Sequence, residues 1–118
     1  MPRPLNLEPR LAAIHAAEYP RFSNAEMARR RAALLAVMQA AEVDHLLVCG
    51  EQRAGSGVAW LTAWPATVEA YAIVAPGEPQ TMYVEWYNHW PQAKKLAHET
   101  EVRWGEHQGL DKLLRDLK

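Results

Sequence analysis

The chain has 118 residues, which is enough for one domain with a core of its own. Its 13 Lys and Arg residues nearly balance its 14 Asp and Glu residues. Proteins that bind nucleic acids or anionic membranes need a basic surplus, so neither partner is expected. A single cysteine, Cys49, excludes an internal disulfide, and the N-terminus lacks the apolar segment of a signal peptide. We therefore expect a cytoplasmic protein.

Residues 1–19 are predicted to form an N-terminal extension that carries a short helix. Tyr19 and Pro20 should end this helix, because the residue before a proline avoids the helical conformation. A separate α/β domain is expected over 20–118. The extension's helix is indicated by apolar residues at helical spacing: Leu7, Leu11 and Ile14.

The next segment predicts a long helix from Asn24 to about Glu42. Ser23 and Glu26 have the spacing of a capping box, in which each side chain bonds the other residue's backbone N–H. Phe22 and Met27 have the spacing of the hydrophobic staple that often accompanies such a cap.

Three consecutive arginines follow in this helix: Arg29, Arg30 and Arg31. They could form a phosphate-binding patch. The even charge balance favours a solvated face paired with nearby acidic side chains, and this is the interpretation we adopt.

The rest of the chain predicts a mixed sheet of about five strands with helices on both faces, a three-layer α/β/α fold. The first strand should be buried on both faces because it is continuously apolar. The third and fourth should form an antiparallel hairpin. The predicted strands are 45–49, 58–61, 69–75, 81–86 and 101–104. Two further helices are predicted: one begins at Asn88, and the last one covers 110–117.

No catalytic set is recognisable in the sequence. The loop 50–57 lacks the lysine and hydroxyl of a phosphate-binding loop, and none of the five histidines has a metal-binding spacing. Cys49 is expected to be a buried small apolar residue rather than a nucleophile. We therefore predict no catalytic residue and no metal ligand in this chain.

Five residues remain as candidates for contact with a ligand or substrate. Trp64 precedes Pro65 at the end of a predicted strand, where its ring could pack a loop or form the wall of a ligand site or subunit interface. The polar stretch Tyr87, Asn88 and His89 follows a strand, where ligand contacts are common. For Asn88, a plain helix cap is the explanation that we favour over a ligand contact. The fifth candidate is Glu69.

Several segments together are similar to a known family. The run from Phe22 to Arg31, followed by the strand at 44–48, resembles the opening of the creatinase N-terminal domain. The segment 58–64 resembles the "N-I-x-Y-L-T-G-F" motif of this family. The hairpin over 69–86 and the strand at 102–105 match in order. The sequence thus resembles the N-terminal domain of the creatinase, Xaa-Pro aminopeptidase and prolidase (M24-like) metallopeptidases.

This resemblance implies a ribonuclease H-like fold and a non-catalytic role. Relatives are usually homodimers, in which this domain caps the active site of the partner subunit. Their C-terminal "pita-bread" domain, which is absent from this sequence, holds two divalent metal ions (Mn, Co or Zn) and cleaves Xaa-Pro peptides or related amides. The parent protein is thus expected to be an Xaa-Pro dipeptidase or aminopeptidase. The alternative is a free-standing small-molecule binding module.

The sequence departs from the family pattern at two places. Ala63 stands where the motif has glycine, and Glu69 stands near an arginine that holds the substrate carboxylate in creatinase. A carboxylate at this position argues against creatine and suggests a cationic or amine group instead. Trp64 stands where the family's aromatic residue approaches the partner's active site.

Overall fold

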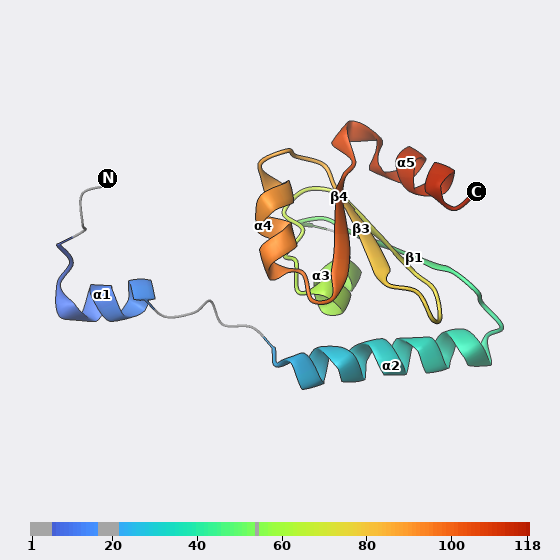
Figure 1. Ribbon diagram of the computed structural model, residues 1–118, viewed down its shortest axis with the longest axis horizontal. Helices are drawn as coiled ribbons and strands as arrows, with labels where there is room; N and C mark the ends of the chain where they lie inside the picture. The colour runs from blue at the N-terminus through green and yellow to red at the C-terminus, as the bar shows by residue number, and fades with distance from the viewer. Residues whose placement is uncertain (1–5, 17–21, 54) are drawn as a thin grey trace.

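The computed structural model describes residues 6–16, 22–53 and 55–118. Within these ranges it contains a four-stranded mixed sheet in the order β1-β2-β3-β4, accompanied by five α-helices (Figure 1). The elements are α1 (Pro9–Ala16), α2 (Asn24–Ala40), β1 (Leu46–Gly50), α3 (Gly57–Thr62), β2 (Ala70–Val74), β3 (Gln80–Val84), α4 (His89–Leu96), β4 (Thr100–Trp104), a 3₁₀ turn (Glu106–Gln108) and α5 (Gly109–Asp116).

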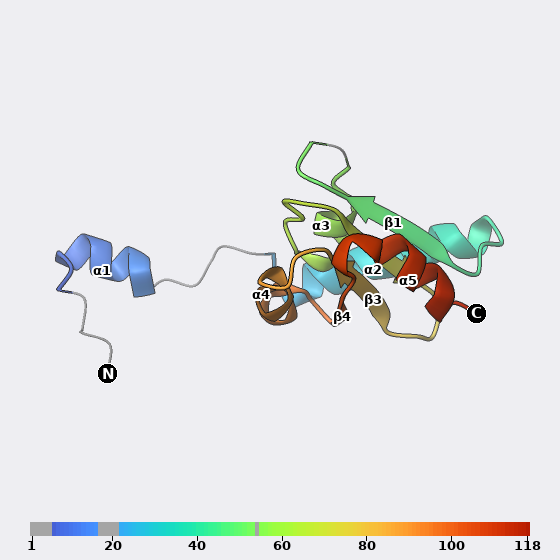
Figure 2. The same ribbon diagram turned by 90° about the horizontal axis from the view of Figure 1, so that it is seen from above.

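Helix α1 confirms the short helix expected in the N-terminal extension. The end expected for it at 18–20 lies outside the described residues. Leu11 and Ile14 are 51% and 61% exposed, and α1 lies apart from the sheet in both views (Figures 1 and 2).

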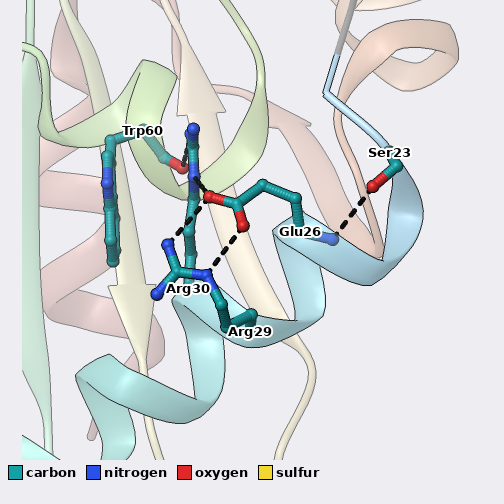
Figure 3. A network of polar contacts seen from close by, with 5 residues as sticks. All are labelled: Ser23, Glu26, Arg29, Arg30 and Trp60. Atoms are coloured by element: carbon teal, nitrogen blue, oxygen red, sulfur yellow. Dashed lines mark hydrogen bonds and ion pairs between the residues drawn. The ribbon is translucent and has the colours of Figure 1, made fainter.

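Helix α2 begins at the predicted cap. The Ser23 hydroxyl accepts a hydrogen bond from the backbone N–H of Glu26 at 3.2 Å (Figure 3). The Glu26 carboxylate pairs with its own helix, at 2.7 Å from Nε of Arg29 and 2.9 Å from Nε of Arg30. Arg29 is exposed and paired with an acid, as the sequence predicts.

The prediction of a solvated arginine face is wrong for the other two arginines. Arg30 is only 8% exposed. Its Nη1 donates to the backbone carbonyl of Trp60 at 3.1 Å, and its guanidinium lies 4.0 Å from the centre of the Phe22 ring. Arg31 donates to the side-chain oxygen of Gln80 at 2.8 Å. These two side chains fasten α2 to α3 and β3 because a guanidinium offers several donors at the end of a long apolar stem.

The predicted second strand, 58–61, is wrong, because this segment is part of helix α3. Its buried side chains are Val58, Leu61 and Thr62, at the helical spacing i, i+3 and i+4. A short apolar run fits a strand and a buried helical turn equally well, so the two cannot be distinguished without the wider pattern. The sheet consequently has four strands.

Helix α3 ends at Ala63, which adopts a left-handed conformation with φ of 68°. Its backbone N–H donates to the carbonyl of Ala59 at 2.9 Å. Glycine is the preferred residue at such a helix end because a Cβ is strained there. This is the position at which the motif that the sequence resembles has glycine, and the left-handed conformation of Ala63 is one that glycine adopts without strain.

Strand β1 is an edge strand, and the prediction that it is buried on both faces is wrong. Leu47 is 38% exposed and Cys49 is also exposed. Both side chains lie on the face opposite to Val48, which packs against the core. Cys49 is therefore not the buried apolar residue predicted from its neighbours.

Strands β2 and β3 form the predicted antiparallel hairpin, with Ala72 opposite Met82. Strand β4 pairs with β3 in parallel, with Met82 opposite Val102, and α4 makes the connection. The buried core lies between one face of the sheet and helices α2, α3 and α4. It is formed by Met38, Val58, Leu61, Trp64, Ala66, Ala70, Ala72, Val74, Met82, Val84, Ala93 and Val102.

Helix α5 packs on β2 and β3 from the other face of the sheet, where Tyr71 and Tyr83 point. Leu113 is 1% exposed there. The Tyr83 hydroxyl bonds the carboxylate of Asp116, which also pairs with Arg103 at 2.8 Å. Figure 2 shows α5 crossing the strands.

Candidate binding groove

The topology of the sheet brings four loop segments together at one end of its strands. The row of strand ends forms the edge of the sheet that is described below. Strands β1, β3 and β4 run in the same direction, and β2 runs against them. The residues that follow β1, β3 and β4 therefore meet the residue that precedes β2. Glu69 and the segment 85–88, which include three of the predicted site residues, lie at this edge together with 104–107.

An open groove of about 740 Å³ lies at this edge, between the segments that follow β3 and β4. Its volume is in the range of small-molecule sites, although it is less enclosed than most of them. Its lining is aromatic and acidic, and consists of Glu85, Trp86, Tyr87, Asn88, Trp104, Glu106 and His107.

Three large rings are exposed in the groove. Trp86 is 47% exposed, Tyr87 62% and Trp104 37%. The rings of Tyr87 and Trp104 meet edge to face with centroids 5.1 Å apart. The indole N–H of Trp104 donates to the backbone carbonyl of Glu85 at 2.9 Å. This bond ties the Trp104 ring to the segment that follows β3. Trp104 is therefore the least exposed of the three rings, and Tyr87 is the most exposed.

The charged groups of the lining are two carboxylates and one imidazole. Nδ1 of His107 lies 2.5 Å from Oε1 of Glu85. Nζ of Lys112, which is not a lining residue, lies 3.5 Å from Oε1 of Glu106. With two carboxylates against one imidazole, the lining residues carry a net negative charge in either protonation state of His107.

Two of the predicted site residues, Tyr87 and Asn88, line this groove directly. Asn88 occupies the N-cap position of α4, but its side chain makes no capping hydrogen bond. The plain helix-cap alternative therefore does not account for its side chain, which is exposed in the groove.

His89 and Trp64 come together behind the groove. The His89 ring lies between the rings of Trp64 and Trp86, with centroid distances of 5.5 Å and 5.1 Å. Nδ1 of His89 is buried and has no hydrogen-bond partner. Trp64 is only 6% exposed. Of the two alternatives left open for Trp64, loop packing matches its position, and Trp86 presents the exposed ring.

Glu69 lies in a neighbouring depression of about 370 Å³ that shares Glu85 with the groove. Burial raises the pKa of Tyr71 to about 12, and the adjacent Glu69 carboxylate contributes to this shift. The wall of the depression also includes Glu51 and Arg53. The edge of the sheet around the groove is thus rich in carboxylates.

The sequence did not single out Trp86, Trp104, Glu85, Glu106 or His107. The sequence predicts Trp86 and Trp104 as the last residues of the strands 81–86 and 101–104, and large rings of this kind are expected in the core or in a buried interface. The signal that could have found Trp86 and Trp104 is their position at the ends of the predicted strands, because loops that follow strands often carry ligand contacts.

Among the described residues, no three His, Cys, Asp or Glu side chains gather in a way that could hold a metal ion. Within the same part of the chain, no helix has the length and apolar character needed to cross a membrane.

Comparisons with known proteins identify the fold. No family model matches the sequence, and no curated protein matches it. A solved structure does match: the N-terminal, creatinase/prolidase-like domain of a protein from Corynebacterium diphtheriae assigned as a metallopeptidase. The match has a TM-score of 0.65 at 18% sequence identity, and covers 78% of this chain and 68% of the other. The resemblance seen in the sequence is thus confirmed at the level of structure, and the chain has the fold of a creatinase/prolidase-like N-terminal domain.

Proposed function

We propose that this chain acts as the non-catalytic N-terminal domain of a metal-dependent hydrolase of the creatinase/prolidase type. In this proposal it contributes to a homodimer and covers the active site of the partner subunit. A C-terminal domain supplies the two divalent metal ions and cleaves Xaa-Pro peptides or related amides. The observation that carries the proposal is the fold shared with the C. diphtheriae domain.

The layering of the chain is compatible with this role. Helices α2, α3 and α4 lie on one face of the four-stranded sheet and α5 on the other, and a ribonuclease H-like fold remains part of the proposal. The groove lies at the edge where loops converge, which is a suitable position for contact with a second domain or subunit. The cytoplasm is the compartment we propose for it.

The coding sequence downstream of Lys118 provides a direct test. An open reading frame that encodes an Asp, His and Glu metal-ligand set would support the proposal. A stop codon directly after Lys118 would contradict it. A second test is to assay Xaa-Pro dipeptide hydrolysis by the purified chain in the presence of Mn²⁺. Turnover by this chain alone would contradict a non-catalytic role.

The aromatic groove favours a second candidate function, a free-standing small-molecule binding module. The two candidates differ in what they require of the protein. A binding module needs only the groove, whereas an accessory domain needs a partner domain. A ligand-dependent rise in melting temperature without turnover, together with a stop codon after Lys118, would favour the binding module.

A further inference from the structure

We propose that the groove after β3 and β4 binds an alkylated organic ammonium ion, held against the faces of Trp86, Tyr87 and Trp104 and balanced by the carboxylates of Glu85 and Glu106. This inference concerns a site within the chain and does not require the second domain of the proposed function.

The first argument is the chemistry of the exposed rings. Aromatic faces carry negative electrostatic potential and attract cations, most strongly cations that hold little water. The groove presents three such rings within one volume of about 740 Å³. Tyr87 and Trp104 meet edge to face, which leaves the ring faces at an angle to each other rather than stacked together. Angled ring faces are the usual walls of aromatic cages for quaternary ammonium groups.

The second argument is that rings in and beside the groove already attract cations of the chain. Nζ of Lys94 lies 4.1 Å from the centre of the Trp90 ring, which contacts Tyr87. Nζ of Lys112 lies 5.9 Å from the centre of the Trp104 ring, near the outer limit for such a contact. Trp86 and Tyr87 have no comparable partner among the described residues. Both rings also contact neighbouring rings, but Trp86 is 47% and Tyr87 62% exposed, so part of each ring is accessible to a cation from solution.

The third argument is charge. The groove lining is negative in either protonation state of His107. The adjoining depression adds Glu51, Glu69 and Arg53, which together contribute a further single negative charge. A cation is therefore drawn to this edge, whereas an anion is repelled from it. The groove is open, so the cation keeps part of its hydration, and a dissociation constant on the order of millimolar is expected.

The indole N–H signals in ¹H–¹⁵N NMR spectra of the whole chain provide the test. Choline chloride is the probe, and its uncharged isostere 3,3-dimethylbutan-1-ol is the matched ligand control. Choline should shift the signals of Trp86 and Trp104 in a saturable way. The signal of Trp60, a half-exposed tryptophan outside the groove, should stay in place. The isostere should bind at least roughly fivefold more weakly because it lacks the charge.

A third ligand separates the contribution of the rings from that of the carboxylates. Ethanolamine carries the same charge as choline but is more strongly hydrated, so it should bind more weakly if the ring faces provide recognition. Equal affinity for ethanolamine and choline would overturn the proposal, because carboxylates alone would then explain binding. Saturable shifts with the neutral isostere of equal strength would also overturn it.

Two variants connect binding to the rings. Trp86→Leu and Tyr87→Leu remove exposed rings, so both variants should fold, which circular dichroism can verify. Each should weaken choline binding roughly fivefold or more. The matched control is Trp60→Leu, which removes a ring of similar exposure elsewhere and should leave the affinity unchanged. Wild-type affinity in both groove variants, or loss of affinity in the control, would overturn the proposal.

Discussion

Arg30, in the middle of α2, donates a hydrogen bond to the backbone carbonyl of Trp60 while its guanidinium lies over the Phe22 ring. Replacing it by alanine should destabilise the protein by about 2–3 kcal/mol, from a charged hydrogen bond, a cation–π contact and lost packing. Urea unfolding of the Arg30→Ala variant measures this change.

The matched control for this change is Arg29→Ala, because the two arginines pair with the same carboxylate. The Arg29 side chain is 64% exposed, so its loss should cost less than about 1 kcal/mol. Equal losses in the two variants would show that the contacts of Arg30 with Trp60 and Phe22 contribute nothing to stability.

Ala63 offers a stabilising substitution. Its φ of 68° places it in the left-handed region, where a Cβ costs about 1 kcal/mol. Ala63→Gly should therefore raise the free energy of unfolding by about 0.5–1 kcal/mol, after the greater freedom of glycine in the unfolded chain is subtracted. Thermal and urea unfolding can detect this gain. Ala59→Gly, within the same helix, should have the opposite sign.

Glu26 predicts a specific acid dependence of stability. Hydrogen bonds from Arg29, and then from Arg30, lower the pKa of Glu26 to about 2 from its ordinary value of 4.5. The folded state therefore favours the ionised carboxylate. Its contribution is fully present above pH 4.5 and is lost as the pH falls through about 2.

Unfolding measurements on wild type and Glu26→Gln across this pH window check the prediction. Wild type should be the more stable protein at neutral pH, and the two should converge as the pH falls from 4.5 towards 2. In an Arg29→Ala background the convergence should still begin near pH 4.5, but it should be smaller and complete at a higher pH, because the largest cause of the lowered pKa is gone. A difference that stays constant down to pH 2 would contradict the assignment.

The two neighbouring leucines of α5 should respond differently to truncation. Leu113 is 1% exposed beneath the helix, whereas Leu114 is 46% exposed. Leu113→Ala should cost about 2–5 kcal/mol through lost burial and a cavity. Leu114→Ala should cost less than about 1 kcal/mol. Urea unfolding compares them, and similar losses would mean that α5 does not pack on the sheet as described.

Gly105 couples the groove to α5. A Cβ at this position would lie 2.7 Å from Cα of Gly109 and 3.3 Å from Cβ of Tyr83. Gly105→Ala should therefore cost about 1–3 kcal/mol through overpacking. Because residue 105 separates Trp104 from Glu106, the same variant should shift the indole N–H signal of Trp104. A stable variant with an unchanged spectrum would contradict this close packing.

The sequence predicted those elements whose signals are local. Ser23 and Glu26 marked the start of α2, and the turn between β2 and β3 marked the hairpin. The side chains that bind distant parts of the chain were not predictable in this way. Arg30 and Arg31 look like surface residues in the sequence because their partners, Trp60 and Gln80, lie 30 and 49 residues away.

The same reason explains the partial prediction of the groove. Tyr87 and Asn88 were found because they directly follow a strand. Trp104 and Glu106 join them only through the parallel pairing of β3 with β4, which a sequence read in order does not reveal. The wrong prediction of a strand at 58–61 has a different cause. The helical spacing of Val58, Leu61 and Thr62 is present in the sequence, but it covers little more than one turn, and such a short apolar segment also fits a strand.

The parallel pairing of β3 and β4 also has a kinetic consequence. The hairpin of β2 and β3 can form from local contacts, whereas β4 must close a loop through α4 before it pairs. One wall of the groove follows β3 and the other follows β4, so the two walls meet only when the loop through α4 has closed. The hydrogen bond from the Trp104 indole to Glu85 therefore forms only after the sheet has accepted its last strand. In a refolding experiment, the Trp104 signal should mark completion of the fold rather than its beginning.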